Sequence, residues 1–231
     1  MKIDVITLFP GMIRGFLEES MLGRARKQNL LEVALHDLRK WGEGKHRIVD
    51  DRPFGGGAGM LLKPGPLGEA IETVRGEGAK TIYLCPDGEP LTTPLARQLA
   101  GEPHLVLVSG HYEGIDERIR EGMIDQEISI GDYVLTNGTL AAAVLIDALA
   151  RHIPGVLGEE KSLTQDSFSD NLLSFPQFTR PANYRGMAVP DILLTGNHEA
   201  IAAWRDEQRR RRTEVRRPDL LSSSKINQSK K

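Results

Sequence analysis

Three apolar segments in the middle of the chain each run directly into a glycine-bearing loop, and this repeated pattern constrains the fold more than any other feature. The segments cluster apolar residues as β-strands do. Helical patterns lie near 67–74, 94–99 and 140–151, between and after them. This alternation predicts an α/β fold, with a mostly parallel sheet and helices on both faces. The three expected strands are Lys80–Cys85, His104–Ser109 and Glu127–Ile130.

The N-terminal part of the chain extends the same alternation. Lys2–Leu8 and Leu31–Leu38 are expected to be strands, and Pro10 is well placed to open a helix after the first of them. In parallel sheets ligands bind beyond the carboxyl ends of the strands, so the glycine loops are the expected site. Taken singly, each glycine could equally serve only a tight turn. The loops are Pro86–Gly88, Gly110–Gly114 and Gly131–Gly138.

The chain of 231 residues is long enough for one large and one small domain. Residues 153–174 carry little periodic pattern and are expected to form a linker. We therefore expect a domain over residues 1–158, a flexible linker over 159–174 and a small helical domain over 175–231. Glu199–Arg212 has a helical pattern, and residues from Ser222 onward are polar.

The net charge of −2 conceals an asymmetry, because residues 205–231 hold ten Lys and Arg against four Asp and Glu. A basic tail on an acidic body indicates a polyanionic partner held from the C-terminal end. The densest run, Arg209, Arg210, Arg211 and Arg212, is the candidate segment for binding such a partner. A solvated helix face is the alternative reading.

The sequence lacks the motifs that are typical of several kinds of chemistry. There is no phosphate loop, and the glycines of Gly55–Gly59 do not have dinucleotide-binding spacing. The histidines lie singly, and Cys85 is the only cysteine, so we expect no dedicated metal site and no intrachain disulfide. The first ten residues do not resemble a signal peptide, and no apolar run is long enough to span a bilayer. We expect a cytoplasmic protein without a membrane partner.

The segment Asp50–Met60 joins two acids, Arg52, Phe54 and four glycines. Such a loop allows the backbone to approach a planar base, while Arg52 meets a phosphate or a base edge. We therefore name Asp50 and Arg52 as candidate RNA contacts. A flexible surface loop is the alternative, and Phe54 could equally anchor the core.

Long motifs throughout the chain closely resemble the bacterial tRNA (guanine-N(1))-methyltransferase family. The resemblance implies a member of the SPOUT methyltransferases, with a trefoil knot at the end of the large domain and a homodimer whose subunits share each active site. The motifs are Asp50–Met60, Gly110–Arg118, Ser129–Leu135, Ile153–Gly158, Asp166–Phe168, Phe178–Pro181 and Leu194–His198.

The resemblance implies that S-adenosylmethionine binds in the knot, at the three loops described above. Glu113 would attract the cationic end of the cofactor, and it is also the nearest candidate ligand for the Mg²⁺ that is reported to assist the family. The implied cofactor-binding residues are Tyr83, Leu84, Pro86, Gly110, Glu113, Gly114, Ile130, Gly131, Asp132, Tyr133, Val134, Leu135 and Gly138.

The implied reaction is methylation of N(1) of guanosine 37 in tRNA, next to the anticodon. Asp166 matches the family's general base, although an Asp before Ser-Phe is otherwise typical of a helix cap. Arg151 matches an Arg that stabilises charge on the guanine carbonyl, and its position also suits a cation at a helix C-terminus. A non-catalytic RNA-binding protein that retains a cofactor pocket and a small-molecule methyltransferase are the alternatives.

Two departures from the family pattern fall in the cofactor loops. Many relatives have Arg at the position of His111, and Gly-Gly-Glu where this chain has Asn137-Gly138-Thr139. Asn accepts left-handed backbone more readily than other non-Gly residues, and Thr can start the following helix. The departures therefore affect only the detail of the cofactor contacts.

Overall fold

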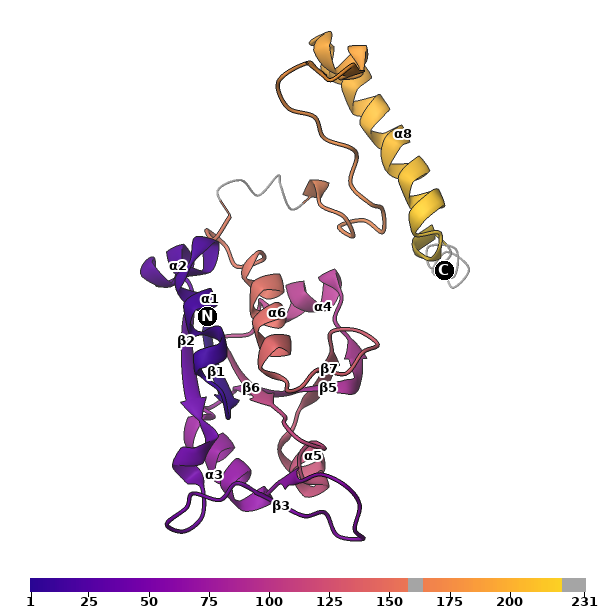
Figure 1. Cartoon of the computed structure of the whole chain (residues 1–231). Coiled ribbons are helices and arrows are strands. Elements are labelled where there is room, and N and C mark those ends of the chain that lie inside the picture. Colours follow the sequence, from indigo (N-terminus) through magenta and orange to yellow (C-terminus); the bar gives the residue numbers. More distant parts are fainter. Residues whose placement is uncertain (158–163, 222–231) are drawn as a thin grey trace, which may run out of the picture. The chain divides into compact units, whose positions relative to one another are not determined.

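The computed structural model describes residues 1–157 and 164–221, which form two compact units divided between Gly158 and Glu159 (Figure 1). The start of the expected linker, 158–163, and the end of the expected C-terminal domain, 222–231, lie outside the described residues. None of the helices in the described ranges is both long and apolar enough to cross a membrane.

The first unit is built on a parallel five-stranded sheet of order β2-β1-β6-β5-β7. The α/β architecture with a parallel sheet is thereby confirmed. Four of the five strands have bounds within one residue of those expected, and β5 ends five residues later than expected. The strands are β1 (Lys2–Thr7), β2 (Glu32–Asp37), β5 (Lys80–Pro90), β6 (His104–Ser109) and β7 (Gln126–Ser129).

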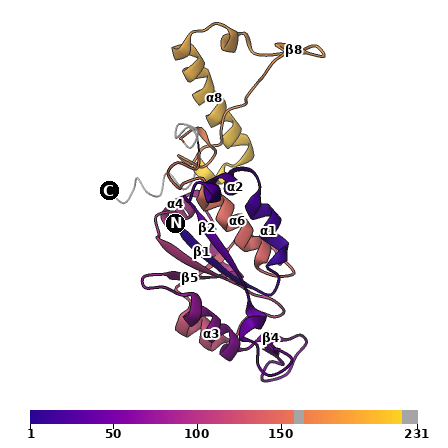
Figure 2. The same cartoon turned by 90° about the vertical axis from the view of Figure 1, so that its left-hand side faces the viewer.

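Helices cover both faces of this sheet, as predicted (Figures 1 and 2). One apolar core unites the strands with α1 (Gly11–Glu18), α2 (Ser20–Lys27), α4 (Thr93–Leu99) and α6 (Thr139–Ala150). The opposite core contains α3 (Pro64–Val74), α5 (Glu117–Met123) and the short 3₁₀ helix η1 (Leu38–Trp41).

Local sequence explains where several helices begin. Pro10 precedes α1, and prolines occupy the first turns of α3 and α4, where no backbone N–H is needed. The Thr92 hydroxyl accepts a hydrogen bond from Leu95 N and caps α4.

The strand β5 continues to Pro90, whereas Pro86–Gly88 was expected to be a loop. Its register against β7 shifts between Leu84 and Glu89, so the intervening residues bulge before pairing resumes. A Cβ at Gly88 would lie 2.4 Å from Ile128 N, and only glycine allows this close approach of the two strands.

A buried ionic group joins three neighbouring strands of the sheet. The Asp4 carboxylate on β1 accepts hydrogen bonds from His36 Nε2 on β2 at 2.6 Å and from His104 Nε2 on β6 at 2.7 Å. Lys2 Nζ lies 3.0 Å away. Burial alone would raise the pKa of Asp4, but these hydrogen bonds hold it below its ordinary value. The carboxylate is therefore kept charged inside the unit.

The second unit is less helical than expected in its described part. One long helix, α8 (His198–Arg216), confirms the helical pattern at 199–212, and the Asn197 side chain caps it through Ala200 N. Its other elements include the hairpin of β8 (Asn183–Tyr184) and β9 (Met187–Ala188) and the 3₁₀ helix η2 (Asp191–Leu194), joined by extended chain and turns.

Candidate functional site

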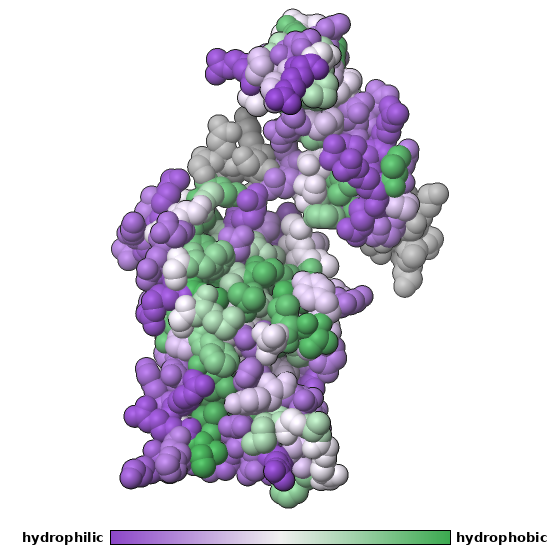
Figure 3. Space-filling view, viewed as in Figure 1, coloured by the Kyte–Doolittle hydropathy of each residue, from purple (hydrophilic) through white to green (hydrophobic). Residues whose placement is uncertain are grey.

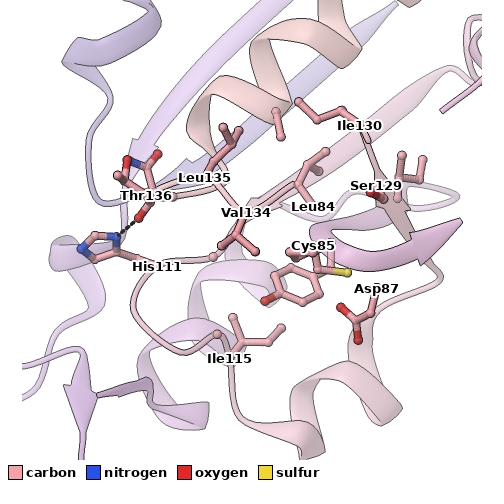
Figure 4. A pocket seen from close by; sticks show the side chains of 18 of the residues that line it. Leu84, Cys85, Asp87, His111, Ile115, Ser129, Ile130, Val134, Leu135 and Thr136 are labelled. Carbon is pink, nitrogen blue, oxygen red and sulfur yellow. Dashed lines mark hydrogen bonds between the residues drawn. The ribbon is translucent and has the colours of Figure 1, made fainter. Parts of the chain in front are cut away.

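A cavity of about 360 Å³ lies at the carboxyl ends of β5, β6 and β7 (Figure 4). Its volume is within the range of small-molecule sites. All of the residues expected to bind the cofactor line it except Asp132, which belongs to the same loop as Gly131. The three glycine-bearing segments, far apart in the sequence, therefore form one site.

Glycines make parts of the cavity wall from backbone alone. A Cβ at Gly110 would lie 2.9 Å from the Tyr83 hydroxyl. A Cβ at Gly138 would meet Gly110 N and Ser109 Cα, each at 3.1 Å. Gly131 has φ of 148°, and a side chain there would meet the Tyr133 ring. Backbone groups thus stand where a side chain would reduce the space for a ligand.

Hydrogen bonds tie two of the loops together. Gly138 N donates to Gly110 O at 2.9 Å, and His111 Nδ1 donates to Thr136 O at 3.1 Å. Asn137 does not need the left-handed backbone that Asn can accept, and its Oδ1 accepts a hydrogen bond from Thr139 N at 2.9 Å. Thr139 starts α6, as predicted.

The start of α6 is also fixed to the sheet. The buried Thr139 hydroxyl bonds with Thr7 Oγ1 at 2.7 Å and with Ser109 Oγ at 3.0 Å. The C-terminal end of the loop from 131 to 138 is consequently fixed to the sheet.

A charged cluster that sequence reasoning missed forms another wall. Arg120 on α5 bonds with Asp87 at 2.7 Å and with both Glu127 oxygens at 2.6 and 2.8 Å. Its guanidinium lies over the Tyr83 ring, 5.5 Å from the centroid. The hydrogen bonds to Glu127 and Asp87 hold the pKa of Arg120 above its ordinary value, and Arg120 holds that of Asp87 below its own.

The only described group of side chains with metal-ligand spacing lies in this cluster: Cys85, Asp87 and Glu127. Arg120 already supplies the cation between the two carboxylates. Burial raises the pKa of the Cys85 thiol to about 12, which keeps it protonated and a poor metal ligand. The arrangement therefore suits an arginine clamp, and Glu113 is not part of it.

The glycine-rich segment 50–60, which begins with β3 (Asp50–Asp51), leads to β4 (Leu61–Leu62) and contacts Glu113, one of the residues that line the cavity. Glu113 N donates to Met60 O at 3.0 Å, and the Glu113 carboxylate lies where a Cβ on Gly59 would be. Phe54 has 101% relative exposure, so the alternative that it anchors the core is wrong. Arg52 is also exposed, and Asp50 pairs with Leu62 in the hairpin.

Arg151 directly follows α6 and lines a separate cavity of about 220 Å³ beside α1 and α2. Exposed apolar side chains continue across the neighbouring surface of α1 and α6, and Figure 3 shows apolar residues gathered there. They are Met12, Phe16, Leu140 and Val144.

In the second unit, Asp166 begins a turn in which its carbonyl accepts from Ser169 Oγ at 2.9 Å. The four consecutive arginines do not share one face of α8. Arg209 is 14% exposed and pairs with Asp170, whereas Arg210 and Arg211 are exposed. Arg212 is half-buried.

Comparisons with known proteins agree over nearly the whole chain. The family model described as tRNA (Guanine-1)-methyltransferase TrmD matches residues 1–223. The chain is 53% identical to a tRNA (guanine-N(1)-)-methyltransferase of Geobacillus kaustophilus, over 100% of this chain and 96% of the relative. A protein of the same name from Chloroflexus aurantiacus is 55% identical, over 96% of this chain and 88% of the relative.

Proposed function

Because the chain belongs to the tRNA (guanine-1)-methyltransferase family, we propose that it transfers a methyl group from S-adenosylmethionine to N(1) of guanosine 37 in tRNA. The cavity at the ends of β5, β6 and β7 is the main support, since it gathers twelve of the thirteen residues that family resemblance assigned to the cofactor. The test is to incubate tRNA with the protein and isotope-labelled S-adenosylmethionine and to locate the label by mass spectrometry. Labelled 1-methylguanosine at position 37 is the expected product, and an unlabelled tRNA would overturn the proposal.

The cavity fits this cofactor chemically. Leu84, Ile130 and Leu135 supply apolar surface for an adenine ring, and backbone groups of the glycine loops can meet its polar edge. Glu113 supplies negative charge for the cationic end. When bound, the cofactor supplies an electrophilic methyl group on a sulfonium.

Replacing Gly138 with Ala should lower the affinity for S-adenosylmethionine by roughly tenfold, about 1.4 kcal/mol. The new methyl group would press against the backbone of Gly110 and Ser109 and displace the loop. Gly122→Ala in α5 is the matched control, since its Cβ would meet nothing within 4 Å. Calorimetric titration measures both variants, and equal affinities would contradict the assignment of this cavity.

The proposed chemistry requires loss of the proton on guanine N(1), because the ring nitrogen must present a lone pair to the methyl carbon. Asp166 would accept that proton as the general base. Negative charge then grows on the guanine carbonyl oxygen, and the Arg151 guanidinium would stabilise it in the transition state. Glu113 remains the candidate ligand if Mg²⁺ assists, and magnesium dependence of the rate tests this role.

We extend the proposal to a homodimer in which each active site is shared between subunits. The exposed apolar residues on α1 and α6 support an interface there, since such surface is typical of obligate contacts. The trefoil knot remains part of the proposal. It is supported by the position of Gly138, just before α6. A Cβ on Gly138 would lie 3.3 Å from Leu84 O on β5 and 3.1 Å from Ser109 Cα on β6. A cytoplasmic location follows from a tRNA substrate.

For tRNA contacts we propose Asp50 and Arg52 in the glycine-rich segment, and Arg210 and Arg211 on the exposed side of α8. The double variant Arg210→Gln/Arg211→Gln should flatten the plot of log affinity against log salt by about two units, because each lost phosphate contact removes about one. Arg209→Gln should leave the slope unchanged, since Arg209 is largely buried beside Asp170. Filter binding of unmodified tRNA over a salt series measures the slopes. Equal slopes for the double variant and the unaltered protein would show that the run is a solvated face.

A further inference from the structure

A second cavity, of about 410 Å³, lies wholly within the C-terminal unit and has no assigned role. It is lined by the extended segment 175–180, by η2 and by the first half of α8. Its volume is that of a small-ligand site. Its lining residues include no Asp or Glu, and the main apolar ones are Phe175, Phe178, Val189, Leu193, Leu194 and Ile201.

Two arginines give this apolar cavity a positive character. Arg205 and Arg180 both line it. The Arg205 guanidinium carbon lies over the Phe175 ring, 4.6 Å from its centroid, in a cation–π contact. The buried Arg205 Nε makes no hydrogen bond to any described residue. The guanidinium groups of Arg180 and Arg205 supply N–H donors to the cavity, and these suit a ligand with acceptor oxygens.

The extended segment offers further polar groups to a ligand. No hydrogen bond between described residues engages the backbone of 175–180, although the chain runs along the cavity. The side chains of Gln177 and Thr179 also line it and can both donate and accept. The cavity thus combines aromatic and aliphatic walls, a cation and free hydrogen-bonding groups.

We propose that this cavity binds one unpaired nucleotide of the tRNA, with its base against Phe178 and the aliphatic wall and its phosphate on the arginines. Proteins recognise single-stranded RNA by stacking bases on aromatic rings and guanidinium planes and by bonding to base edges. Arginine is suited to phosphate because its fork of N–H donors matches the oxygens. The proposal rests on tRNA being the substrate, and it assigns a separate contact far along the chain from the cofactor loops.

The test compares Phe178→Ala with Tyr184→Ala in the full-length protein. Both aromatic rings are about half exposed in the same unit, at 48% and 54%, but only Phe178 lines the cavity. Phe178→Ala should weaken binding of unmodified tRNA by roughly tenfold, from the lost stacking on one base. Tyr184→Ala should change it less than about twofold. Arg180→Gln gives a second variant at the cavity and should also weaken tRNA binding.

Cofactor affinity, thermal stability and methyl transfer are measured beside tRNA binding to separate the outcomes. Affinity for S-adenosylmethionine should be the same in all variants, and thermal melts show whether each variant is folded. If the unaltered protein methylates tRNA but Phe178→Ala and Arg180→Gln bind it normally, the nucleotide site is overturned while the proposed function stands. If tRNA binds through these residues but no methyl is transferred, the proposed function fails and the nucleotide site stands. Equal losses in Phe178→Ala and Tyr184→Ala would also overturn a specific cavity contact.

Discussion

Replacing Asp166 with Asn should reduce the rate of methyl transfer by about 10²-fold or more, while the affinity for S-adenosylmethionine stays nearly unchanged. The amide has almost the same shape but cannot accept the guanine proton, and general-base catalysis is typically worth about 10²- to 10⁴-fold. Single-turnover kinetics at saturating tRNA measure the chemical step, and calorimetry measures cofactor binding.

The control for this experiment is Asp170→Asn, four residues further along the same segment. Asp170 pairs with Arg209 at a half-exposed position, and such pairs contribute little. Its removal should leave the single-turnover rate within about twofold. A variant Asp166→Asn that keeps more than roughly a tenth of the rate would remove Asp166 from the role of base.

Two inactive variants, Arg151→Ala and Asp166→Ala, should regain about a quarter of the unaltered activity when they are unfolded together and reassembled. In a two-fold dimer with shared sites, a mixed dimer has one doubly altered site and one intact site. Random reassembly makes half of the dimers mixed, and half of their sites are intact. The assay compares the co-refolded mixture with each variant refolded alone.

Gel filtration must show that dimers have formed, and differently tagged chains allow the mixed species to be isolated. If both residues of a site came from one chain, every site in every dimer would carry an alteration. Activity near zero in purified mixed dimers would therefore refute the shared site, while the methyltransferase assignment would stand.

The central sheet could be predicted well from the sequence because its inner strands are buried on both faces. Such strands appear as short, nearly continuous apolar runs, and β6 (His104–Ser109) has the bounds expected of it. The helix α5 could not be found in this way, since only Ile119 of its seven residues is buried and one residue gives no periodicity. The extension of β5 to Pro90 depends on pairing with Ser129, a tertiary contact that overrides the local turn preference of Pro86–Gly88.

The candidate site was predictable at the level of loops, and its individual residues came from family resemblance. The rule that ligands bind at the carboxyl ends of parallel strands located the cavity. The role of Arg120 could not be predicted, because its partners Asp87 and Glu127 come close to it only in the folded chain. The charge pattern predicted that all four arginines of the run on α8 contact a polyanion, but Asp170, 39 positions before Arg209, pairs with one of them.

The buried Asp4 carboxylate, which is bonded by side chains of three strands, favours the correct register of the sheet during folding. His36 lies opposite Ile6 in the pairing of β1 with β2, and His104 lies opposite Lys2 in the pairing of β1 with β6, so both imidazoles stand two positions from Asp4 on its own side of the sheet. A slip of one position in either pairing would turn the imidazole to the other side. The charge would then be buried with fewer partners, at a cost of several kcal/mol. Apolar strands tolerate misalignment because one aliphatic contact replaces another. Misalignment at Asp4 would instead leave a buried carboxylate without its hydrogen-bond partners. A polar group that never meets the substrate can thus select the one alignment in which the three glycine loops converge.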